Sequence, residues 1–294
     1  MYFKTFRPSA ALEPYIRSYY YYQVEVEGTG NNELRRYPTD GSPKLLVNLG
    51  DTFLAGNHSN NLKPISGCRL LGSLTRQMVS MPAGRMAFLA IRFMPGKAAC
   101  FFNVRGSELT DGSTALESVW GAYGREFALR LFDLSDIHEM LIYIESVLLS
   151  QLHQRIIDDL EIATALDKIR QTNGQIRIQD LAKYVGLSLR QFERRFTNLV
   201  GLYPKRLCRI SRFAKTISVC DGDQKYDWVR LALEAGYSDH AHFIRECKYF
   251  TGRSPKSYLA TRSPLEVAVW SKNNFPRSEK VGAFPSSIIK NPLL

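Results

Sequence analysis

The chain has 294 residues, 45% of them hydrophobic and 12% aromatic, which is enough apolar material for two folded domains and excludes a disordered chain. Its net charge of +11, from 39 Lys and Arg against 28 Asp and Glu, favours an anionic partner, either nucleic acid or an acidic membrane surface. It has no apolar run of about 18 residues and no basic-flanked apolar start, so we expect a cytoplasmic protein without a membrane span or signal peptide.

Residues 1–93 are predicted to be mainly β-strands separated by turns. Stretches rich in Tyr, Val and alternating apolar residues predict strands at residues 2–6, 16–26, 45–49, 69–74, 77–81 and 86–93. Residues 28–32 are predicted to form a turn, and the Asn-rich residues 56–64 a loop. Short strands separated in this way predict an antiparallel sandwich or barrel.

Helical patterns follow the strands. They predict a short helix from Pro95 to Phe102, a turn at residues 109–112, and longer helices over residues 115–134 and 135–153. The last helix carries an apolar stripe at helical spacing, made of Ile137, Leu141, Ile144, Leu148 and Leu152. The stripe packs either on the strands or in a dimer seam, and the absence of a sustained heptad repeat favours the strands.

A helix predicted at residues 158–171 opens a second domain, so we divide the chain into residues 1–155, 156–262 and 263–294. In the last part, residues 265–270 are predicted to dock on the body or add a strand. The rest of that part is predicted to be an exposed extension.

Residues 179–259 contain one pattern twice, in the order Leu-Ala, Gly, Ser, Phe, Arg, Gly and Pro-Lys. The first copy is Leu181-Ala182, Gly186, Ser188, Phe192, Arg194, Gly201 and Pro204-Lys205. The second copy is Leu231-Ala232, Gly236, Ser238, Phe243, Arg245, Gly252 and Pro255-Lys256. We interpret the repeat as two helix-turn-helix units. In each, glycine ends the first helix, and Ser188, or else Ser238 or Asp239, caps the second.

Each second helix has an apolar face and a polar face. The predicted inward residues are Leu189, Phe192, Phe196 and Leu199 in the first copy, and Phe243, Cys247 and Phe250 in the second. The predicted outward residues are Arg190, Gln191, Arg194, Thr197 and Asn198, then Ala241, Ile244, Arg245 and Lys248, with His240 and His242 at the edges. Arg and Gln suit the acceptors of guanine and adenine in a major groove. An ordinary solvated face is the alternative, which the tandem repeat disfavours.

A helix predicted at residues 204–220 joins the two units. Its buried stripe is predicted to consist of Leu207, Ile210, Phe213 (or Ala214) and Ile217. Its 17 residues span roughly 25 Å, which would place the two second helices about one DNA turn, roughly 34 Å, apart. Residues 158–262 carry 19 Lys and Arg against 12 Asp and Glu, a net +7, whereas the other 189 residues carry +4. This concentration of charge favours contact with phosphates.

Residues 158–262 resemble the DNA-binding domain of the AraC/XylS family of bacterial transcription regulators. The resemblance rests on Leu181-Ala182, Phe192-x-Arg194-Arg195-Phe196, Ala235-Gly236-Tyr237-Ser238-Asp239, His242-Phe243-x-Arg245 and Gly252-x-Ser254-Pro255-x-x-Tyr258. Cys247 stands where the family usually has phenylalanine, which should loosen the second core. The resemblance implies base contacts by Arg190, Gln191, Arg194, His240, Ala241, Ile244 and Arg245. The candidates for phosphate contact are Lys205, Arg206, Arg209 and Lys256.

The N-terminal part resembles the sensor-like domain of one branch of the same family. The matching residues are Pro38-x-Asp40-Gly41, Asn48-x-Gly50-Asp51, Gly72 and Ile91-Arg92-Phe93-x-Pro95-Gly96. The resemblance implies a domain that binds an effector or partner subunit and often dimerises, without assigning pocket residues. We therefore expect an α+β regulator: an N-terminal antiparallel β sandwich or barrel with helices, then an all-α tandem helix-turn-helix domain. Its expected partner is double-stranded DNA; a small-molecule effector, a second copy and RNA polymerase are further candidates.

Other chemistries find less support in the sequence. A metal-dependent β-barrel enzyme needs several convergent His, and the β region holds only His58, so we expect no metal, no cofactor and no catalysis. The five cysteines, Cys68, Cys100, Cys208, Cys220 and Cys247, are scattered singly. A methyl-accepting repair protein, or a redox sensor at Cys68 or Cys100, remains an alternative. So does a low-specificity architectural binder, although the Arg and Gln types argue against it.

Overall fold

The computed structural model describes residues 1–25, 34–82, 84–152, 159–220, 226–270 and 279–280. Its N-terminal strands are β1 (Tyr2–Arg7), β2 (Ile16–Glu25), β3 (Arg35–Tyr37), β4 (Lys44–Asn48), β5 (Phe53–Gly56), β6 (Lys63–Ile65), β7 (Cys68–Leu71), β8 (Met78–Met81), β9 (Arg85–Phe93) and β10 (Ser113–Ala115). The N-terminal helices are the 3-10 turn Ala98–Cys100, α1 (Gly106–Leu109), α2 (Leu116–Trp120), α3 (Ala122–Phe132) and α4 (Ile137–Leu152). The turn predicted at residues 28–32 lies outside the described residues.

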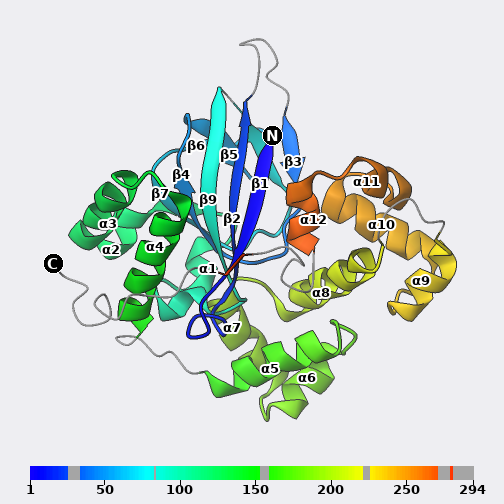
Figure 1. The fold of residues 1–294 in the computed structure, drawn as a ribbon. Helices are drawn as coiled ribbons and strands as arrows, with labels where there is room; N and C mark the ends of the chain where they lie inside the picture. The colour runs from blue at the N-terminus through cyan, green and yellow to red at the C-terminus, as the bar shows by residue number, and fades with distance from the viewer. Residues whose placement is uncertain (26–33, 83, 153–158, 221–225, 271–278, 281–294) are drawn as a thin grey trace.

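The strands form two sheets that face each other as a sandwich (Figure 1). The larger sheet has the order β10-β7-β4-β9-β2-β1-β11, in which β11 is Glu279–Lys280, and the smaller one has the order β3-β8-β5-β6. Neighbouring strands are antiparallel, except that β11 (Glu279–Lys280) pairs parallel with the end of β1. The expected antiparallel β architecture is therefore confirmed, as a sandwich.

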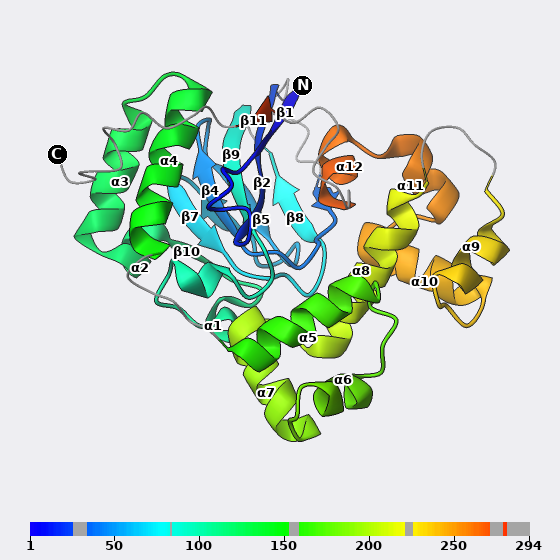
Figure 2. The same cartoon turned by 60° about the horizontal axis from the view of Figure 1, so that its bottom comes forward.

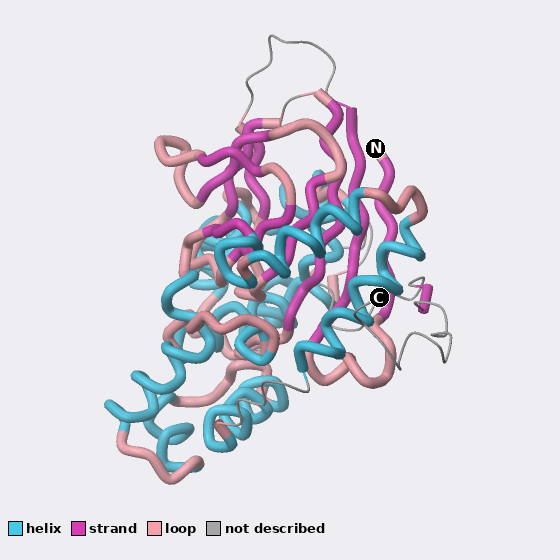
Figure 3. The backbone as a smooth tube through the Cα atoms, turned by 90° about the vertical axis from the view of Figure 1, so that its left-hand side faces the viewer, coloured by secondary structure: helices cyan, strands magenta, loops and turns pink. Residues whose placement is uncertain are grey.

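The larger sheet is covered on both faces, which explains the long apolar runs of its central strands. In β2, Tyr19 and Tyr21 face the core under the helices, whereas Tyr20 and Tyr22 face the core between the sheets. The helices α2, α3 and α4 lie over the outer face of this sheet (Figures 2 and 3). On α4, Ile144 is fully buried in the core under these helices, so the predicted stripe packs on the strands.

The C-terminal part is all helical. Its elements are α5 (Leu160–Gln171), α6 (Ile178–Tyr184), α7 (Leu189–Val200), α8 (Pro204–Ser218), α9 (Trp228–Glu234), α10 (His240–Thr251), α11 (Pro255–Thr261) and α12 (Pro264–Trp270). The boundary predicted between residues 155 and 156 lies outside the described residues. Residues 265–270, which were predicted either to dock on the body or to add a strand, dock on it as part of the helix α12.

The helix α12 lies between the two domains. Its Leu265 joins the core between the two sheets, whereas Val269 and Trp270 join the core of the helical domain. The ring of Trp270 meets Phe213 of α8 edge to face, with 4.9 Å between centroids. The core of the helical domain therefore extends beyond residue 262, where the sequence-based division placed its end.

Candidate nucleic-acid interface

The first helix-turn-helix unit consists of α6 and α7. Gly186 ends α6 with φ +73°, a conformation that favours glycine. Ser188 then caps α7: its Oγ accepts from the backbone nitrogen of Gln191 at 3.3 Å, and the Gln191 side chain accepts from the backbone nitrogen of Ser188 at 3.3 Å. This reciprocal capping box fixes the start of α7, so the predicted cap at Ser188 is confirmed.

The exposed face of α7 carries the three residues predicted to read bases. Arg190, Gln191 and Arg194 are all exposed. Phe192, Phe196 and Val200 hold the opposite face in the core. Leu189, which the sequence placed on the buried face, is 40% exposed, because it is the first residue of α7 and precedes the turn that enters the core.

Gln191 has a structural role besides the predicted one. Its Oε1 also accepts from the hydroxyl of Ser188 at 2.9 Å. Reading adenine with both ends of the amide needs this oxygen to accept from the base. Gln191 must therefore release the cap or share its oxygen before it can read adenine in that way.

Arg195, next to the reading residues, anchors α7 rather than facing outward. Its guanidinium donates to Asp159 at 2.7 Å and to Glu161 at 2.9 Å. These hydrogen bonds raise the pKa of Arg195 above its ordinary value. The pairing ties the middle of α7 to the first turn of α5, which Asp159 also caps.

The second unit, α9 and α10, repeats this design with a different cap. Asp239 caps α10 by accepting from the backbone nitrogen of His242 at 2.7 Å, while Ser238 donates to Asp239. Ala241 and Arg245 are exposed, in line with their predicted contact with bases. His240 and Ile244 are half-buried beside them. Cys247 has no exposed surface, and it shares its core with Trp270 from α12.

The helix α8 connects the units and fixes one against the other. Pro204 occupies its first turn, as predicted, and Leu207, Ile210, Phe213 and Ile217 are buried. Arg212 donates to the carbonyl oxygen of Gly174, in the turn that leads from α5 into the first unit, at 3.3 Å, and to that of Gly236 in the second unit at 3.2 Å. The two units are thus bridged within the helical domain itself.

The four candidates for phosphate contact differ in their surroundings. Lys205 and Lys256 are exposed at the first turns of α8 and α11. Arg209 pairs with Glu246 at 2.6 Å. Arg206 is only 9% exposed and donates to the carbonyl oxygen of Thr75 in the N-terminal domain. In this conformation, two of the four cations are therefore bonded inside the protein.

The N-terminal domain packs against the helical domain through several of its motif residues. A Cβ on Gly41 would lie 2.8 Å from Leu202 and 3.1 Å from Ile210, so only glycine fits there without a shift. Thr110 donates to the carbonyl oxygen of Gly201 at 2.6 Å. Arg92 donates to main-chain carbonyl oxygens of α12. The predicted sensor-like motif thus places residues at a domain interface.

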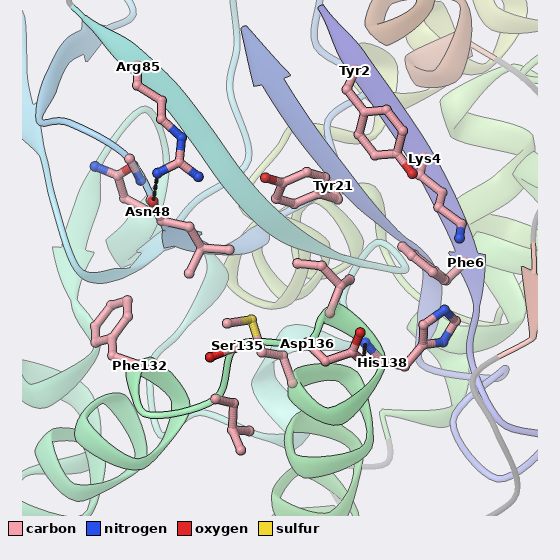
Figure 4. Close-up of a pocket in the computed structure, with 15 residues that line it drawn as sticks. Tyr2, Lys4, Phe6, Tyr21, Asn48, Arg85, Phe132, Ser135, Asp136 and His138 are labelled. Carbon is pink, nitrogen blue, oxygen red and sulfur yellow. Dashed lines mark hydrogen bonds between the residues drawn. The ribbon is translucent and has the colours of Figure 1, made fainter. Parts of the chain in front are cut away.

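A groove of about 630 Å³ lies on the outer face of the larger sheet, and none of these interface residues lines it (Figure 4). One wall carries Tyr2, Lys4 and Phe6 of β1, and the other is the turn from α3 into α4. Asp136 in that turn accepts from the backbone nitrogen of His138 at 2.8 Å and so caps α4. The groove combines aromatic walls with polar groups, and sequence reasoning assigned none of its residues.

All five cysteines are free and buried. Burial raises the pKa of the Cys68 thiol to about 12 and that of Cys247 to about 11. A thiol acts as a nucleophile or redox sensor in its thiolate form, which this environment disfavours. The structure therefore gives no support to a repair or redox function of these residues. None of the described helices is long and apolar enough to cross a membrane.

Comparison with known families decides the class of the chain. Residues 181–261, which include both recognition helices α7 and α10, match the model of a helix-turn-helix domain of the AraC type. The helical domain is therefore similar to the helix-turn-helix domain of AraC-type regulators. The chain is accordingly a DNA-binding regulator of transcription. Residues 4–115 match a model described as a domain of unknown function (DUF6597).

Several solved structures are similar to this chain. The apo form of a single-residue variant of ToxT from Vibrio cholerae strain SCE256 is 11% identical with a TM-score of 0.49, over 83% of this chain and 98% of that chain. ToxT from Vibrio cholerae O395 is 12% identical with a TM-score of 0.45, over 88% and 97%. An AraC-type regulator from Chromobacterium violaceum is 24% identical with a TM-score of 0.32, over 35% and 93%. The curated proteins compared give no match.

Proposed function

We propose that this regulator reads two successive major grooves of one DNA duplex, with α7 in the first and α10 in the second. The observation that carries the proposal is that equivalent turns of the two units expose side chains suited to bases, among them Arg194 and Arg245. Both lie beyond a capped helix start, where recognition helices contact bases. Arg190, Gln191, His240, Ala241 and Ile244 complete the proposed reading set.

Phosphate contacts position the protein along the duplex in this proposal. Lys205 and Lys256 are the exposed cations placed for them, at equivalent first turns of α8 and α11. Each such contact contributes to affinity without regard to sequence and adds to the salt dependence of binding. Arg209 would contribute only after leaving Glu246.

In vitro selection of random duplexes by the full-length protein tests the proposal. We expect an enriched motif with two half-elements about one turn, roughly 10 base pairs, apart. Strong, salt-dependent binding without any enriched sequence would contradict it and favour the architectural alternative. A motif with only one half-element would contradict the proposed role of the second unit and leave that of the first unit standing.

We further propose that a small-molecule effector binds the groove between the larger sheet and α4. Its volume of about 630 Å³ lies within the range of ligand pockets, roughly 300–1,000 Å³. The ring of Tyr21 forms part of its floor, at 5.9 Å from the ring of exposed Tyr2. Lys4 and Arg85 add two cationic side chains to the lining.

A thermal-shift screen of metabolites, followed by DNA binding with each hit, tests the effector proposal. A hit should lose its shift in the Tyr2→Ala variant and keep it in Tyr203→Ala, which removes a similarly exposed tyrosine outside the groove. Hits that act equally on both variants would place the effector elsewhere. A homodimer and a contact with RNA polymerase remain predictions, and ultracentrifugation with and without the selected DNA measures the first.

A further inference from the structure

Residues 72–77, here called the spacer loop, join β7 to β8 and lie against both helix-turn-helix units. At the first unit, Ser73 Oγ donates to the carbonyl oxygen of Val200, the last residue of α7, at 2.9 Å. At the second unit, the carbonyl oxygen of Thr75 accepts from the hydroxyl of Tyr249 on α10 at 3.5 Å. One loop of the N-terminal domain thus contacts the C-terminal end of each recognition helix.

Arg206 of α8 is the central contact of the spacer loop. It donates to the carbonyl oxygen of Thr75. Its guanidinium carbon lies 4.5 Å from the ring centroid of Tyr249 and 4.9 Å from that of Phe250. Stacking of this kind suits the planar guanidinium, whereas the ammonium of lysine lacks both the plane and the fork of donors. Arg206 therefore joins the loop, α8 and α10 at one point.

The spacer loop is itself hydrogen-bonded to Asp111, which precedes β10 of the larger sheet. The carboxylate of Asp111 accepts from the backbone nitrogen of Thr75 at 2.7 Å and from its hydroxyl at 2.6 Å. The backbone nitrogen of Asp111 donates to the carbonyl oxygen of Ser73 at 3.0 Å. Asp111 has φ +58°, in the left-handed region that Asp and Asn tolerate better than most residues. A loop bonded at both of its contact residues can transmit the position of the β body to the helices.

We propose that the spacer loop holds α7 and α10 at a fixed separation, and that Arg206 is a positioning residue for the reading of DNA rather than a phosphate contact. The inference rests on the proposed function and deepens it. The bridge by Arg212 joins the units through the turns at Gly174 and Gly236, whereas the spacer loop joins the ends of their recognition helices. The N-terminal domain then determines which spacing of half-elements the protein accepts.

The test uses full-length protein and a duplex library in which the two half-elements selected by the wild type are separated by varied numbers of base pairs. The variant Asp111→Asn keeps the side-chain size and the tolerated backbone but replaces the two charge-assisted hydrogen bonds to Thr75 with weaker neutral ones, so it loosens Thr75. Arg206→Met removes the contact at the helical side. We expect the wild type to prefer one spacing at least tenfold, and both variants to bind two or more adjacent spacings within threefold of each other.

Lys205→Met is the matched control, because it removes an exposed cation next to Arg206. We expect it to keep the wild-type spacing and to reduce the salt slope of binding by about 1, while Arg206→Met leaves the slope unchanged. Circular dichroism melting verifies that each variant is folded. If Arg206→Met does not fold, the spacing profile of Asp111→Asn decides the outcome.

Three outcomes would overturn the inference. A wild-type spacing profile in a folded Asp111→Asn protein would show that the loop does not set the spacing. A fall in the salt slope of Arg206→Met equal to that of Lys205→Met would make Arg206 a phosphate contact. Tighter binding by Asp111→Asn at an unchanged spacing would make the loop inhibitory. If the wild type selects no bipartite motif at all, the proposed function fails first, and this inference falls with it.

Discussion

Arg92 and Asp40 form an ion pair whose side chains are 1% and 2% exposed, and the same guanidinium donates to the carbonyl oxygens of Ala268 and Val269 at 3.1 Å each. The pair joins β9, the turn before β4 and α12. Breaking one partner of a buried pair leaves the other charge uncompensated, which costs more than any exposed pair contributes. The contact between the domains therefore depends on a charge buried in the N-terminal domain.

Asp40→Asn should lower the free energy of unfolding by about 3–5 kcal/mol at pH 7. Burial alone would raise the pKa of Asp40, but the charges of Arg92, Lys44 and Arg17 outweigh it and hold the pKa well below its ordinary value. The stabilisation is complete above that ordinary value, near 4, and is lost as the pH falls below it. Urea unfolding between pH 7 and pH 2 measures this effect. The free energy of unfolding should fall less with decreasing pH in Asp40→Asn than in the wild type.

Glu108→Gln is the matched control for Asp40→Asn. It removes a carboxylate that pairs with Arg105 at the surface, where both side chains are more than half exposed. Exposed ion pairs contribute little to stability. The free energy of unfolding of this variant should therefore fall with decreasing pH as it does in the wild type. If the free energy of unfolding falls equally between pH 7 and pH 2 in the wild type and in Asp40→Asn, another group dominates the acid sensitivity.

Ending the chain after residue 262 should destabilise the protein far more than ending it after Trp270. The shorter chain loses α12, and with it Trp270, which is 2% exposed in the core of the helical domain. Loss of a buried tryptophan costs about 3–5 kcal/mol. The shorter chain also loses the two carbonyl oxygens that accept from Arg92, which adds to this cost. Thermal unfolding of the two truncations measures the difference. Equal midpoints would mean that α12 adds nothing to the fold.

Gln191→Glu separates the two roles of Gln191. Glutamate retains the oxygen that completes the capping box with Ser188 but lacks the amide donor for adenine. We expect unchanged thermal stability with weaker specific DNA binding. Gln191→Ala should lose both, with a cost in stability of roughly 1 kcal/mol or less. If Gln191→Glu binds the selected DNA as the wild type does, the side chain is a cap only.

Arg194→Ala should weaken binding to the selected DNA by roughly 1–3 kcal/mol and relax the base preference at one position. Arg194 is exposed on the reading face of α7, so the substitution should leave the fold intact. Fluorescence anisotropy with selected and random duplexes measures both effects. An equal loss on random DNA would assign Arg194 to the backbone.

Iodoacetamide at pH 7.5 should leave all five cysteines of the native protein unmodified over the time in which free cysteine reacts fully. The thiols are buried, and their pKa values lie far above this pH where the shift is resolved, about 12 for Cys68 and 11 for Cys208. The thiolate fraction is therefore minute. Mass spectrometry after unfolding in urea should show five modifications. Rapid native labelling of one cysteine would revive the redox-sensor alternative.

The helix-turn-helix units could be predicted from sequence because their signals are local. Gly186, Ser188 and Pro204 each specify a helix end or start within a few residues. The strands β3, β5, β6 and β10 were missed because stretches of three or four residues show little alternation. The loop predicted at residues 56–64 therefore overlaps the end of β5 and the start of β6. The outward face of α7 was predicted correctly at Arg190, Gln191, Arg194 and Asn198. Leu189, predicted to face inward, is exposed, and Thr197, predicted to face outward, is half-buried.

The surroundings of the other candidate site residues could not be read from sequence. Arg206 has the same charge as its neighbour Lys205, yet it is buried by a loop 131 positions away in the chain. The resemblance placed Asp40 and Arg92 in a sensor-like motif, and nothing local indicates that Arg92 bonds to α12. The cap by Asp239 was one of two alternatives that the sequence left open, because Ser238 is also a good cap residue.

The acceptors of Arg92 on α12 are main-chain oxygens 176 and 177 positions further along the chain. During synthesis from the N-terminus, β9 emerges long before α12 exists. The Arg92 guanidinium of a nascent β body therefore lacks two of its acceptors until α12 has been synthesised. Chains that end before α12 should on this ground be degraded faster than chains that contain it.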